Sequence, residues 1–367
     1  MSSENDRFIT AAKEHFGDDS FTRSQFLEFG ENSGFGANVA QRILIYKRVN
    51  RIKHGLYTFS ELPNVDSLPK EKSVNVLEAV AVIESSKASF SYVPKIDDSY
   101  VSWGHFNDLK TIVDSRRFFP TYICGPSGNG KTMMVEQICA KSNREFIRVQ
   151  ITPETDEDDL IGGWRLVKGE TVFSKGPVIT AMEMGAILLI DEVDRGSNKL
   201  MCLQGILEGK PVLIKKTGEI VAPKSGFNII CTANTKGNGD PSGKFISASI
   251  IDDAFLERFT ISLEQSFPSK AIERKILLSH LEKFGVDVET DVRKEIELLV
   301  TWSDSIRKTY KAGGVDDVVS TRRLCHIVET YSVFKNFDKS VNFCLARFEE
   351  DTNIAFSEMY KALKTPV

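Results

Sequence analysis

The sequence has little of what marks a membrane, secreted or polyanion-coating protein. The six cysteines among 367 residues include no Cys-x-x-Cys pair. Cys124, Cys139, Cys202 and Cys231 lie in apolar runs, as expected of small, reduced core residues. No apolar segment follows a basic start, and no run approaches membrane-spanning length. The formal net charge of -4 excludes a chain that is basic throughout. We therefore expect a cytoplasmic protein without membrane contact.

The length and the residue pattern predict four successive parts. A chain of 367 residues with 41% hydrophobic content has enough apolar residues for a sizeable core and two or three domains. Strand and helix patterns alternate in the middle of the chain, which is typical of a parallel sheet sandwiched by helices. We expect a helical, winged-helix-like module over 1–62, a linker over 63–99, an α/β core over 100–266 and a helical domain over 267–367.

The N-terminal module reads as three helices and a strand. Helical spacing places Phe8, Ile9, Ala12 and Phe16 on the first helix, a capping box Thr22-x-x-Gln25 on the second, Val39, Ile43 and Tyr46 on the third, and a strand over 55–59. The third helix and its tail are basic, with Arg42, Lys47, Arg48, Arg51, Lys53 and His54. A DNA recognition helix and the solvated face of a protein-docking module both fit this pattern. We favour the second, because a short basic run alone is weak evidence of DNA binding. A short helix over 74–83 is expected within the linker.

A glycine-rich loop follows an apolar run and precedes a helical pattern. It reads Gly125-Pro126-Ser127-Gly128-Asn129-Gly130-Lys131-Thr132, which has the G-x-x-x-x-G-K-[ST] spacing of a P-loop. The glycines let several backbone N–H groups point at one anion, at the positive end of the following helix. Lys131 would reach the β- and γ-phosphates, and the Thr132 hydroxyl would ligate Mg²⁺. A chance glycine-rich turn is the alternative, and the flanking strand and helix oppose it.

Two carboxylates end a second apolar run. Residues 186–190 are all apolar, and Asp191 and Glu192 follow them. Ligands sit at the carboxyl ends of strands in such sheets, so Asp191 would hold Mg²⁺ through water and Glu192 would deprotonate the attacking water. The alternative is that the two acids only cap the next helix.

A third run, over 227–233, ends at Asn234. On an adjacent strand, Asn234 would lie beside the γ-phosphate and help to hold the water. Asparagine at a strand end is otherwise a common turn residue.

Two arginines are candidates to neutralise charge on a phosphoryl group. Arg258 ends a short amphipathic helix before the last strand, and Arg322 follows Ser320-Thr321 at the start of a helix in the second domain. Arg323 is the rival of Arg322. Because arginine is usually a surface residue, composition alone supports neither assignment.

These landmarks, in this order, resemble the AAA+ ATPases, and within them the MoxR group and the CobS-type ATPases of aerobic cobaltochelatase. Three further stretches carry the resemblance. They are residues 156–163 followed by 171–177, a hairpin insert; residues 212–220, with a turn at Thr217-Gly218; and Thr232-Ala233-Asn234-Thr235 leading into Gly237-x-Gly239-Asp240-Pro241-Ser242-Gly243. The resemblance covers about residues 100–331.

The resemblance implies ATP and Mg²⁺ as cofactors and a role for each landmark. Lys131 and Thr132 would serve nucleotide and metal, Asp191 and Glu192 hydrolysis, and Asn234 sensor 1. Arg258 would be the arginine finger, and Arg322 would be sensor 2 in a helical lid. Glu257 stands where the group usually has Asp. No N-K-x-D stretch reads guanine, which favours ATP over GTP.

In the usual topology Arg258 lies too far from its own P-loop, so a homo-oligomeric ring, hexameric by resemblance, is implied. The first hypothesis is a motor that remodels a partner complex such as a cobalt chelatase, whose partner carries a von Willebrand A domain. The N-terminal module does not look like the usual cobaltochelatase start, which weakens the chelatase assignment. A nucleic-acid-directed motor is the second hypothesis. A ring that hydrolyses ATP only as a conformational scaffold is the third.

Overall fold

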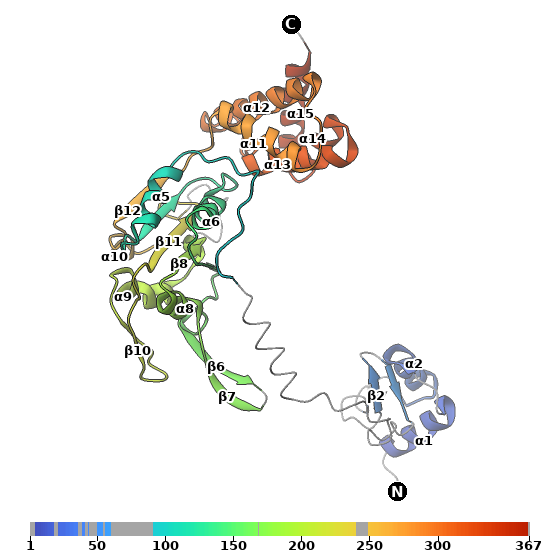
Figure 1. Cartoon of the computed structure of the whole chain (residues 1–367). Coiled ribbons are helices and arrows are strands. Elements are labelled where there is room, and N and C mark those ends of the chain that lie inside the picture. Colours follow the sequence, from blue (N-terminus) through green and yellow to red (C-terminus); the bar gives the residue numbers. More distant parts are fainter. Residues whose placement is uncertain are drawn as a thin grey trace, which may run out of the picture. The chain divides into compact units, whose positions relative to one another are not determined.

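The computed structural model describes residues 4–17, 21–35, 39–40, 43, 50–53, 56–59, 91–167, 169–239 and 249–365. The chain divides into two compact units, Met1–Ser89 and Phe90–Val367 (Figure 1). Several predictions lie outside the described residues: most of the third helix over 39–46, the side chains of the basic run, the helix over 74–83 and the motif residues 240–243. In the part of the chain that is described, no helix is long and apolar enough to cross a membrane.

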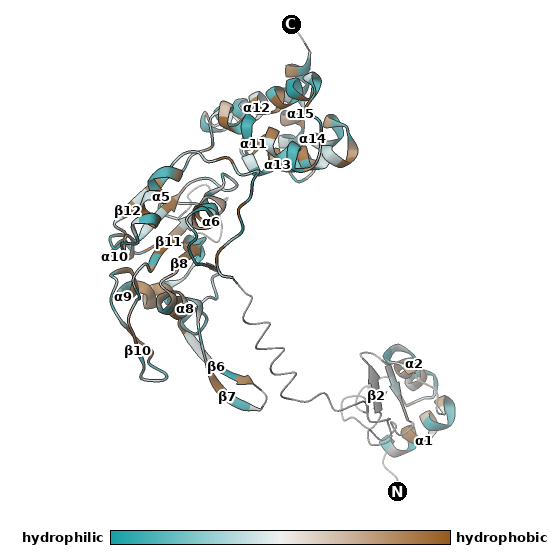
Figure 2. Ribbon diagram, viewed as in Figure 1, coloured by the Kyte–Doolittle hydropathy of each residue, from teal (hydrophilic) through white to brown (hydrophobic). Residues whose placement is uncertain are grey.

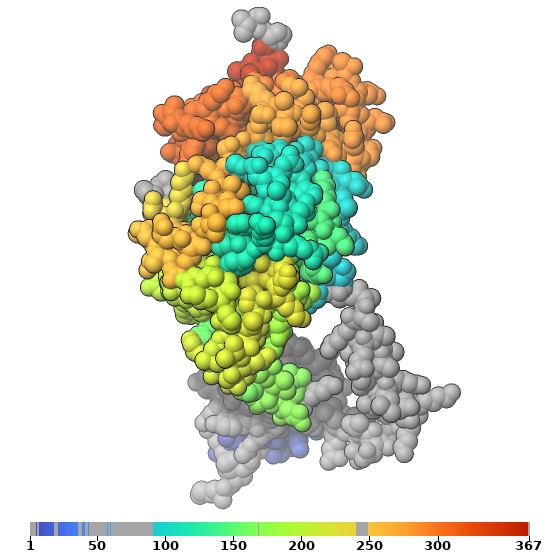
Figure 3. All heavy atoms as spheres, turned by 60° about the vertical axis from the view of Figure 1, so that its left-hand side comes forward, coloured from blue at the N-terminus to red at the C-terminus, as the bar shows by residue number. Residues whose placement is uncertain are grey.

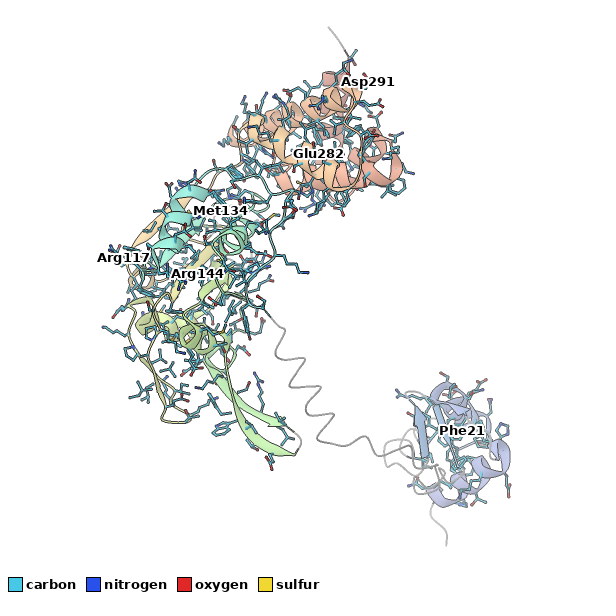
Figure 4. The ribbon with its side chains drawn as sticks, viewed as in Figure 1. Phe21, Arg117, Met134, Arg144, Glu282 and Asp291 are labelled. Carbon is cyan, nitrogen blue, oxygen red and sulfur yellow. The ribbon has the colours of Figure 1, made fainter. Side chains whose placement is uncertain are left out.

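The N-terminal unit combines two described helices with a small antiparallel sheet. Its elements are α1 (Glu4–Phe16), β1 (Phe21–Thr22), α2 (Arg23–Asn32), β2 (Asn50–Lys53) and β3 (Leu56–Thr58), with strand order β1-β3-β2. Phe8, Phe21 and Phe26 are buried together, and Figure 4 labels Phe21 inside this unit. The predicted capping box is present, with Thr22 and Gln25 bonded reciprocally. Only β3 was expected; β1 and β2 are additional, because Thr22 of β1 was interpreted only as a helix cap and the basic residues of β2 as the tail of the third helix.

A five-stranded parallel sheet forms the core of the second unit. Its strands are β4 (Thr121–Cys124), β5 (Phe146–Gln150), β8 (Ile187–Asp191), β11 (Asn228–Ala233) and β12 (Ile261–Glu264), in the order β12-β4-β11-β8-β5. Every residue of β4, β8 and β11 is buried, as expected of strands covered on both faces. The predicted α/β class with a parallel sheet is confirmed.

Alternate side chains of each strand enter two separate cores. On one face α5 (Phe106–Ser115) and α6 (Lys131–Lys141) pack against Ile187 and Leu189, and on the other α8 (Pro177–Met184) packs against Leu188 and Ile190. Figure 4 labels Met134 of α6 on the first face.

Arg144, labelled in the same view, connects the end of α5 to the loops that precede β8 and β11. It donates hydrogen bonds to the carbonyl oxygens of Val113, Gly185 and Gly226. Burial lowers its pKa.

Two hairpins leave the core on the side away from the helical region (Figure 1). The first is β6 (Gly162–Val167) with β7 (Glu170–Lys175), preceded by α7 (Glu157–Leu160). The second is β9 (Val212–Leu213) with β10 (Ile220–Val221), preceded by the short helical segments η2 (Val193–Arg195), η3 (Asn198–Leu203) and α9 (Gln204–Leu207). Both hairpins fall where the sequence places them.

Helices alone form the C-terminal region, which has a core of its own around Trp302. They are α11 (Lys270–Lys283), α12 (Thr290–Lys311), α13 (Thr321–Phe334), α14 (Phe337–Leu345) and α15 (Glu350–Lys364). The short helix α10 (Asp253–Leu256) precedes β12. Figure 3 shows helices α11 to α15, orange to red, gathered at one end of the second unit. We call this region the lid.

Residues 91–99, the end of the predicted linker, lie against the core and the lid. The amide nitrogen of Asp97 donates to Gln137 of α6 at 2.8 Å, and the Asp97 carboxylate pairs with Lys283 of α11 at 2.8 Å.

Candidate active site

Most of the predicted site residues meet at the carboxyl ends of the strands, in a cavity of about 600 Å³ between the core and the lid. The P-loop lies between β4 and α6, and the ends of β8 and β11 stand beside it. The start of α13 and residues 99–103 complete the walls. This location agrees with the general placement of ligands in parallel sheets.

Close approach by other residues explains two of the loop glycines. Gly125 has φ 148°, and a side chain there would meet the carbonyl oxygen of Gln265. Gly128 has φ 75°, and a Cβ atom there would lie 2.7 Å from the hydroxyl of Ser320 in the lid. Asn129 donates from its amide to the Gln265 carbonyl at 2.5 Å, which ties the loop to the segment that joins core and lid.

Lys131 is buried, and its ammonium faces the inside of the loop. Nζ donates to the carbonyl oxygens of Gly125 at 2.7 Å and Pro126 at 3.0 Å, and lies 3.5 Å from Oδ1 of Asn234. Burial lowers the pKa of Lys131 to about 8, although the carboxylates of Asp194 and Asp191 act in the opposite direction. A desolvated cation next to exposed loop amides is suited to bind a polyphosphate.

Asp191 accepts hydrogen bonds at both of its oxygens. Oδ1 accepts from the hydroxyls of Thr132, at 3.0 Å, and Thr232, and Oδ2 accepts from Nε of Arg148 at 3.0 Å. Thr132 lies in the first turn of α6, Thr232 in β11 and Arg148 in β5, so one carboxylate joins a helix to two strands. The contact between the Thr132 hydroxyl and the carboxylate creates an oxygen set that fits a Mg²⁺ ion also bound by phosphate oxygens. In the described residues, no cluster of three or more acidic, histidine or cysteine side chains would hold a metal by protein groups alone.

Glu192 occupies a left-handed backbone conformation, with φ 58° and ψ 44°. A non-glycine residue there is unfavourable, and such conformations gather at functional sites. Its carboxylate accepts from Nε2 of Gln150 at 3.1 Å and pairs with Arg195 at 3.3 Å. It makes no side-chain cap to the helical turn that follows. The capping alternative is therefore wrong, and Glu192 lines the cavity with its carboxylate held by Gln150 and Arg195.

Asn234 follows the last residue of β11 and lines the cavity beside Lys131. Its position is fixed by Asp194, whose Oδ2 accepts from the amide nitrogens of Asn234 at 2.9 Å and Thr235 at 3.0 Å. Asp194 is buried, and its other oxygen has no hydrogen-bond partner among the described residues. The loop after β11 is thus held by a carboxylate from the turn after β8.

The two candidate arginines lie in different places. Arg322 lines the cavity, and its amide nitrogen donates to the carbonyl oxygen of Gly128 at 3.0 Å. Its rival Arg323 is not among the residues that line the cavity. Arg258 lies outside the cavity, and its Nε donates to Glu208 at 2.9 Å. The chain therefore brings Arg322, but not Arg258, to its own P-loop.

Sequence reasoning missed Arg148, Gln150, Thr232 and Asp194. Arg148 and Gln150 come from β5, which pairs with β8 so that Gln150 lies opposite Asp191. The sequence signal for Arg148 and Gln150 was that they are polar side chains at the end of a strand. Their partners could not be assigned because strand order is not written in the sequence.

Apolar side chains line the end of the cavity beside the lid. They are Tyr100, Val101, Trp103, Met133 and Ile276. His280 and His326 of the lid stand there too, and burial lowers the pKa of both. Imidazole rings and apolar walls suit a flat heterocycle.

Comparison with known proteins agrees with this geometry. Residues 120–259 match the model of the AAA domain, dynein-related subfamily. The aerobic cobaltochelatase subunit CobS of Sinorhizobium sp is 25% identical over 251 residues, which cover 66% of this chain and 74% of that protein. An uncharacterised protein of Staphylococcus aureus is 25% identical over 248 residues, covering 64% and 87%.

Two solved structures are also similar. A RuvB mutant from Thermotoga maritima has a TM-score of 0.45 and 16% identity, covering 73% of this chain and 72% of that one. A putative ATPase from Cytophaga hutchinsonii has a TM-score of 0.40 and 16% identity, covering 71% and 81%. The match over residues 120–259 is to an AAA domain, which implies nucleotide binding. Its likeness to CobS is distant.

Proposed function

We propose that this chain is the ATPase subunit of a ring-shaped motor of the MoxR/CobS type, which hydrolyses Mg-ATP to remodel a partner protein complex. The observation that carries the proposal is the meeting of Lys131, Asp191, Glu192 and Asn234 in one cavity, under a lid that adds Arg322. Those groups supply a phosphate cradle, a metal site, a base and a cationic cover.

In this proposal the triphosphate lies along the P-loop, and the base lies against the apolar end of the cavity. Lys131 leaves the carbonyl oxygens that it now contacts and turns to the phosphates. Thr132 and Asp191 hold Mg²⁺, which would neutralise charge on the phosphates. Arg148 keeps the Asp191 carboxylate in place from the adjacent strand.

Glu192 removes the proton from the attacking water, and Asn234 orients that water through its amide. Gln150 and Arg195 hold the Glu192 carboxylate to one side of the cavity. The negative charge that spreads over the transferred phosphoryl group is balanced by Lys131 and Arg322, and by Arg258 of a neighbouring copy. In this proposal the copies form a ring in which Arg258 serves the neighbouring cavity, since within one copy it lies outside the cavity.

The two hairpins are proposed as the surface that moves the partner. Side chains on the first hairpin are apolar and exposed, with Trp164 at 52% and Leu166 at 77% exposure, and Figure 2 shows apolar colour on its strands. Exposed apolar side chains in such a group are typical of protein contact. A chelatase-like complex with a separate von Willebrand A-domain subunit is the named case, by the likeness to CobS.

The test uses Glu192→Gln, which keeps the shape of the side chain and removes its basicity. We expect ATP hydrolysis to fall by about a hundredfold to ten-thousandfold while Mg-ATP binding is retained. Glu358→Gln, at an exposed position on α15, is the matched control and should leave hydrolysis unchanged. A Glu192→Gln variant that hydrolyses ATP at the normal rate would exclude the site assignment.

The same variant, trapped with Mg-ATP in the native host, should retain its partner. Recovery of a von Willebrand A-type or chelatase-like subunit supports the remodelling function. Recovery of DNA or a nuclease supports the second hypothesis and contradicts the first.

A nucleic-acid-directed motor is a second candidate, favoured by one observation. The N-terminal unit combines helices with a three-stranded antiparallel sheet, and Arg51 and Lys53 of the basic run belong to its strand β2. Binding of duplex DNA to the full chain that weakens steeply between low and physiological salt would support it. Salt-insensitive or absent DNA binding would exclude it.

A further inference from the structure

A buried ion pair in the lid ties three helices together. Glu273 of α11 is 1% exposed, and it receives Nη2 of Arg307 from α12 at 2.8 Å and Nη1 at 3.0 Å, one on each carboxylate oxygen. Nε of Arg307 donates to the carbonyl oxygen of Val319, just before α13, at 2.9 Å. The paired geometry is the strong, directional form of an arginine–carboxylate contact.

The first residue of α13 is the third member of this cluster. The hydroxyl of Thr321 donates to Oε1 of Glu273 at 2.7 Å, and the hydroxyl of Ser303 lies 3.3 Å from Oε2. The guanidinium of Arg307 also lies 4.1 Å above the ring of Phe267, in the segment between β12 and α11. The start of α13 is therefore fastened to α11, to α12 and, through them, to the junction with the core.

The same helix start touches the P-loop. Arg322, the next residue, donates its amide hydrogen to the carbonyl oxygen of Gly128 at 3.0 Å and lines the cavity. Thr321 and Arg322 both line the cavity, but neighbouring residues of a helix point about 100° apart, so the Thr321 hydroxyl turns to Glu273 while Arg322 takes a different direction. Glu273 and Arg307 themselves are not among the residues that line the cavity.

Stability alone does not explain this cluster. A buried ion pair is often no more stabilising than apolar residues of similar volume, because removing two charges from water is costly. What the ion pair adds is orientation of its neighbours. The Glu273 carboxylate orients the Thr321 hydroxyl, and the Arg307 guanidinium orients the Val319 carbonyl.

We propose that Glu273 and Arg307 are positioning residues for nucleotide binding. Acting through Thr321, they set the start of α13 so that Arg322 faces the phosphates. The inference rests on the proposed function, since it requires that Arg322 contact ATP bound at the P-loop.

The test is a double-mutant cycle between Thr321→Val and Arg322→Ala. It is measured as the affinity for a fluorescent Mg-ATP analogue in a Glu192→Gln background that does not turn the nucleotide over. Thr321→Val keeps the shape of the side chain and removes the hydroxyl. We expect it to weaken binding about tenfold when Arg322 is present and less than about twofold when Arg322 is already alanine, because contacting residues in one network are coupled. Thr321→Ser, which keeps the hydroxyl, should restore most of the affinity.

Thr309→Val is the matched control, because the Thr309 hydroxyl donates within its own helix, to the carbonyl oxygen of Ser305. It should change the affinity less than about twofold. If Thr321→Val lowers the melting temperature sharply, the cycle is repeated with the pair Glu273→Leu and Arg307→Met, which replaces both charges with apolar groups and is expected to fold.

Equal effects of Thr321→Val with and without Arg322 would overturn the inference and leave the proposed function standing. A chain that fails to bind Mg-ATP before the lid is altered would overturn both.

Discussion

The two ends of the second unit use charge in opposite ways. At the cavity, Asp191 is 4% exposed and is held by hydrogen bonds from two strands and a helix. At the hairpins, Lys215 pairs with Glu157 and Lys175 with Glu183 and Glu219, all on exposed or half-exposed side chains. Apolar side chains such as Leu166 face solvent there.

Chemistry requires charges fixed in low dielectric, whereas a contact surface requires groups that a partner can reach. The second unit provides both kinds of surface, because the sheet holds the charged groups of the cavity in place at one end and the hairpins extend into solvent from the other. The comparison therefore predicts large effects of substitutions at the cavity and small ones at the hairpins.

The largest effect is expected from Arg258→Ala, which tests whether the cavity is complete in one copy. A missing arginine finger lowers hydrolysis by about a thousandfold. Mixing this variant with Glu192→Gln, itself inactive, should restore about a quarter of the normal rate in a randomly mixed ring, because some intact cavities then face an intact arginine.

Arg274→Ala, at an exposed position paired with Glu297 on the lid, is the control and should not lower the rate. A mixture as inactive as its components would contradict a shared site.

An intermediate effect is expected from pH, because Lys131 is buried at the cavity. Its pKa is lowered to about 8, and the phosphates of bound ATP favour the charged form. The affinity for Mg-ATP is therefore greatest below pH 8 and falls by about tenfold per pH unit above 8. In that range Lys131 takes up a proton when ATP binds. Calorimetry in two buffers of different ionisation enthalpy measures that uptake.

Lys131→Arg, whose guanidinium stays charged, should lose this pH dependence. Affinity that is constant from pH 7 to 9.5 in the unaltered chain would contradict the buried lysine as the phosphate contact.

The smallest effect is expected at the hairpin end. Lys175→Met removes two exposed ion pairs and should change the free energy of unfolding by less than about 1 kcal/mol, as exposed pairs do. Urea unfolding measures it, with Lys361→Met on α15 as the control at an exposed position. A loss several times larger would show that the ion pairs at the hairpins are structural and would remove the contrast between the two ends.

Local sequence was sufficient for the landmarks whose residues are consecutive. The P-loop, the LLIDE strand and the run ending at Asn234 were predictable because a buried strand reads as an apolar run and its functional group follows directly. The parallel α/β class followed from the same alternation. The small strands β1 and β2 were not predicted, since β1 has only two residues and the basic segment of β2 resembles the tail of a helix.

What the amino-acid sequence determined on its own is the set of chemical groups and the strand ends on which they stand. Tertiary structure alone decided their partners: Arg148 beside Asp191, Asp194 under Asn234, and Thr321 on Glu273. It also separated Arg322, which reaches the cavity, from Arg258, which does not. The reason is physical. A strand's own residues fix which face each side chain takes, but strand order and helix packing bring together residues 40 or more positions apart, and no local pattern encodes that choice.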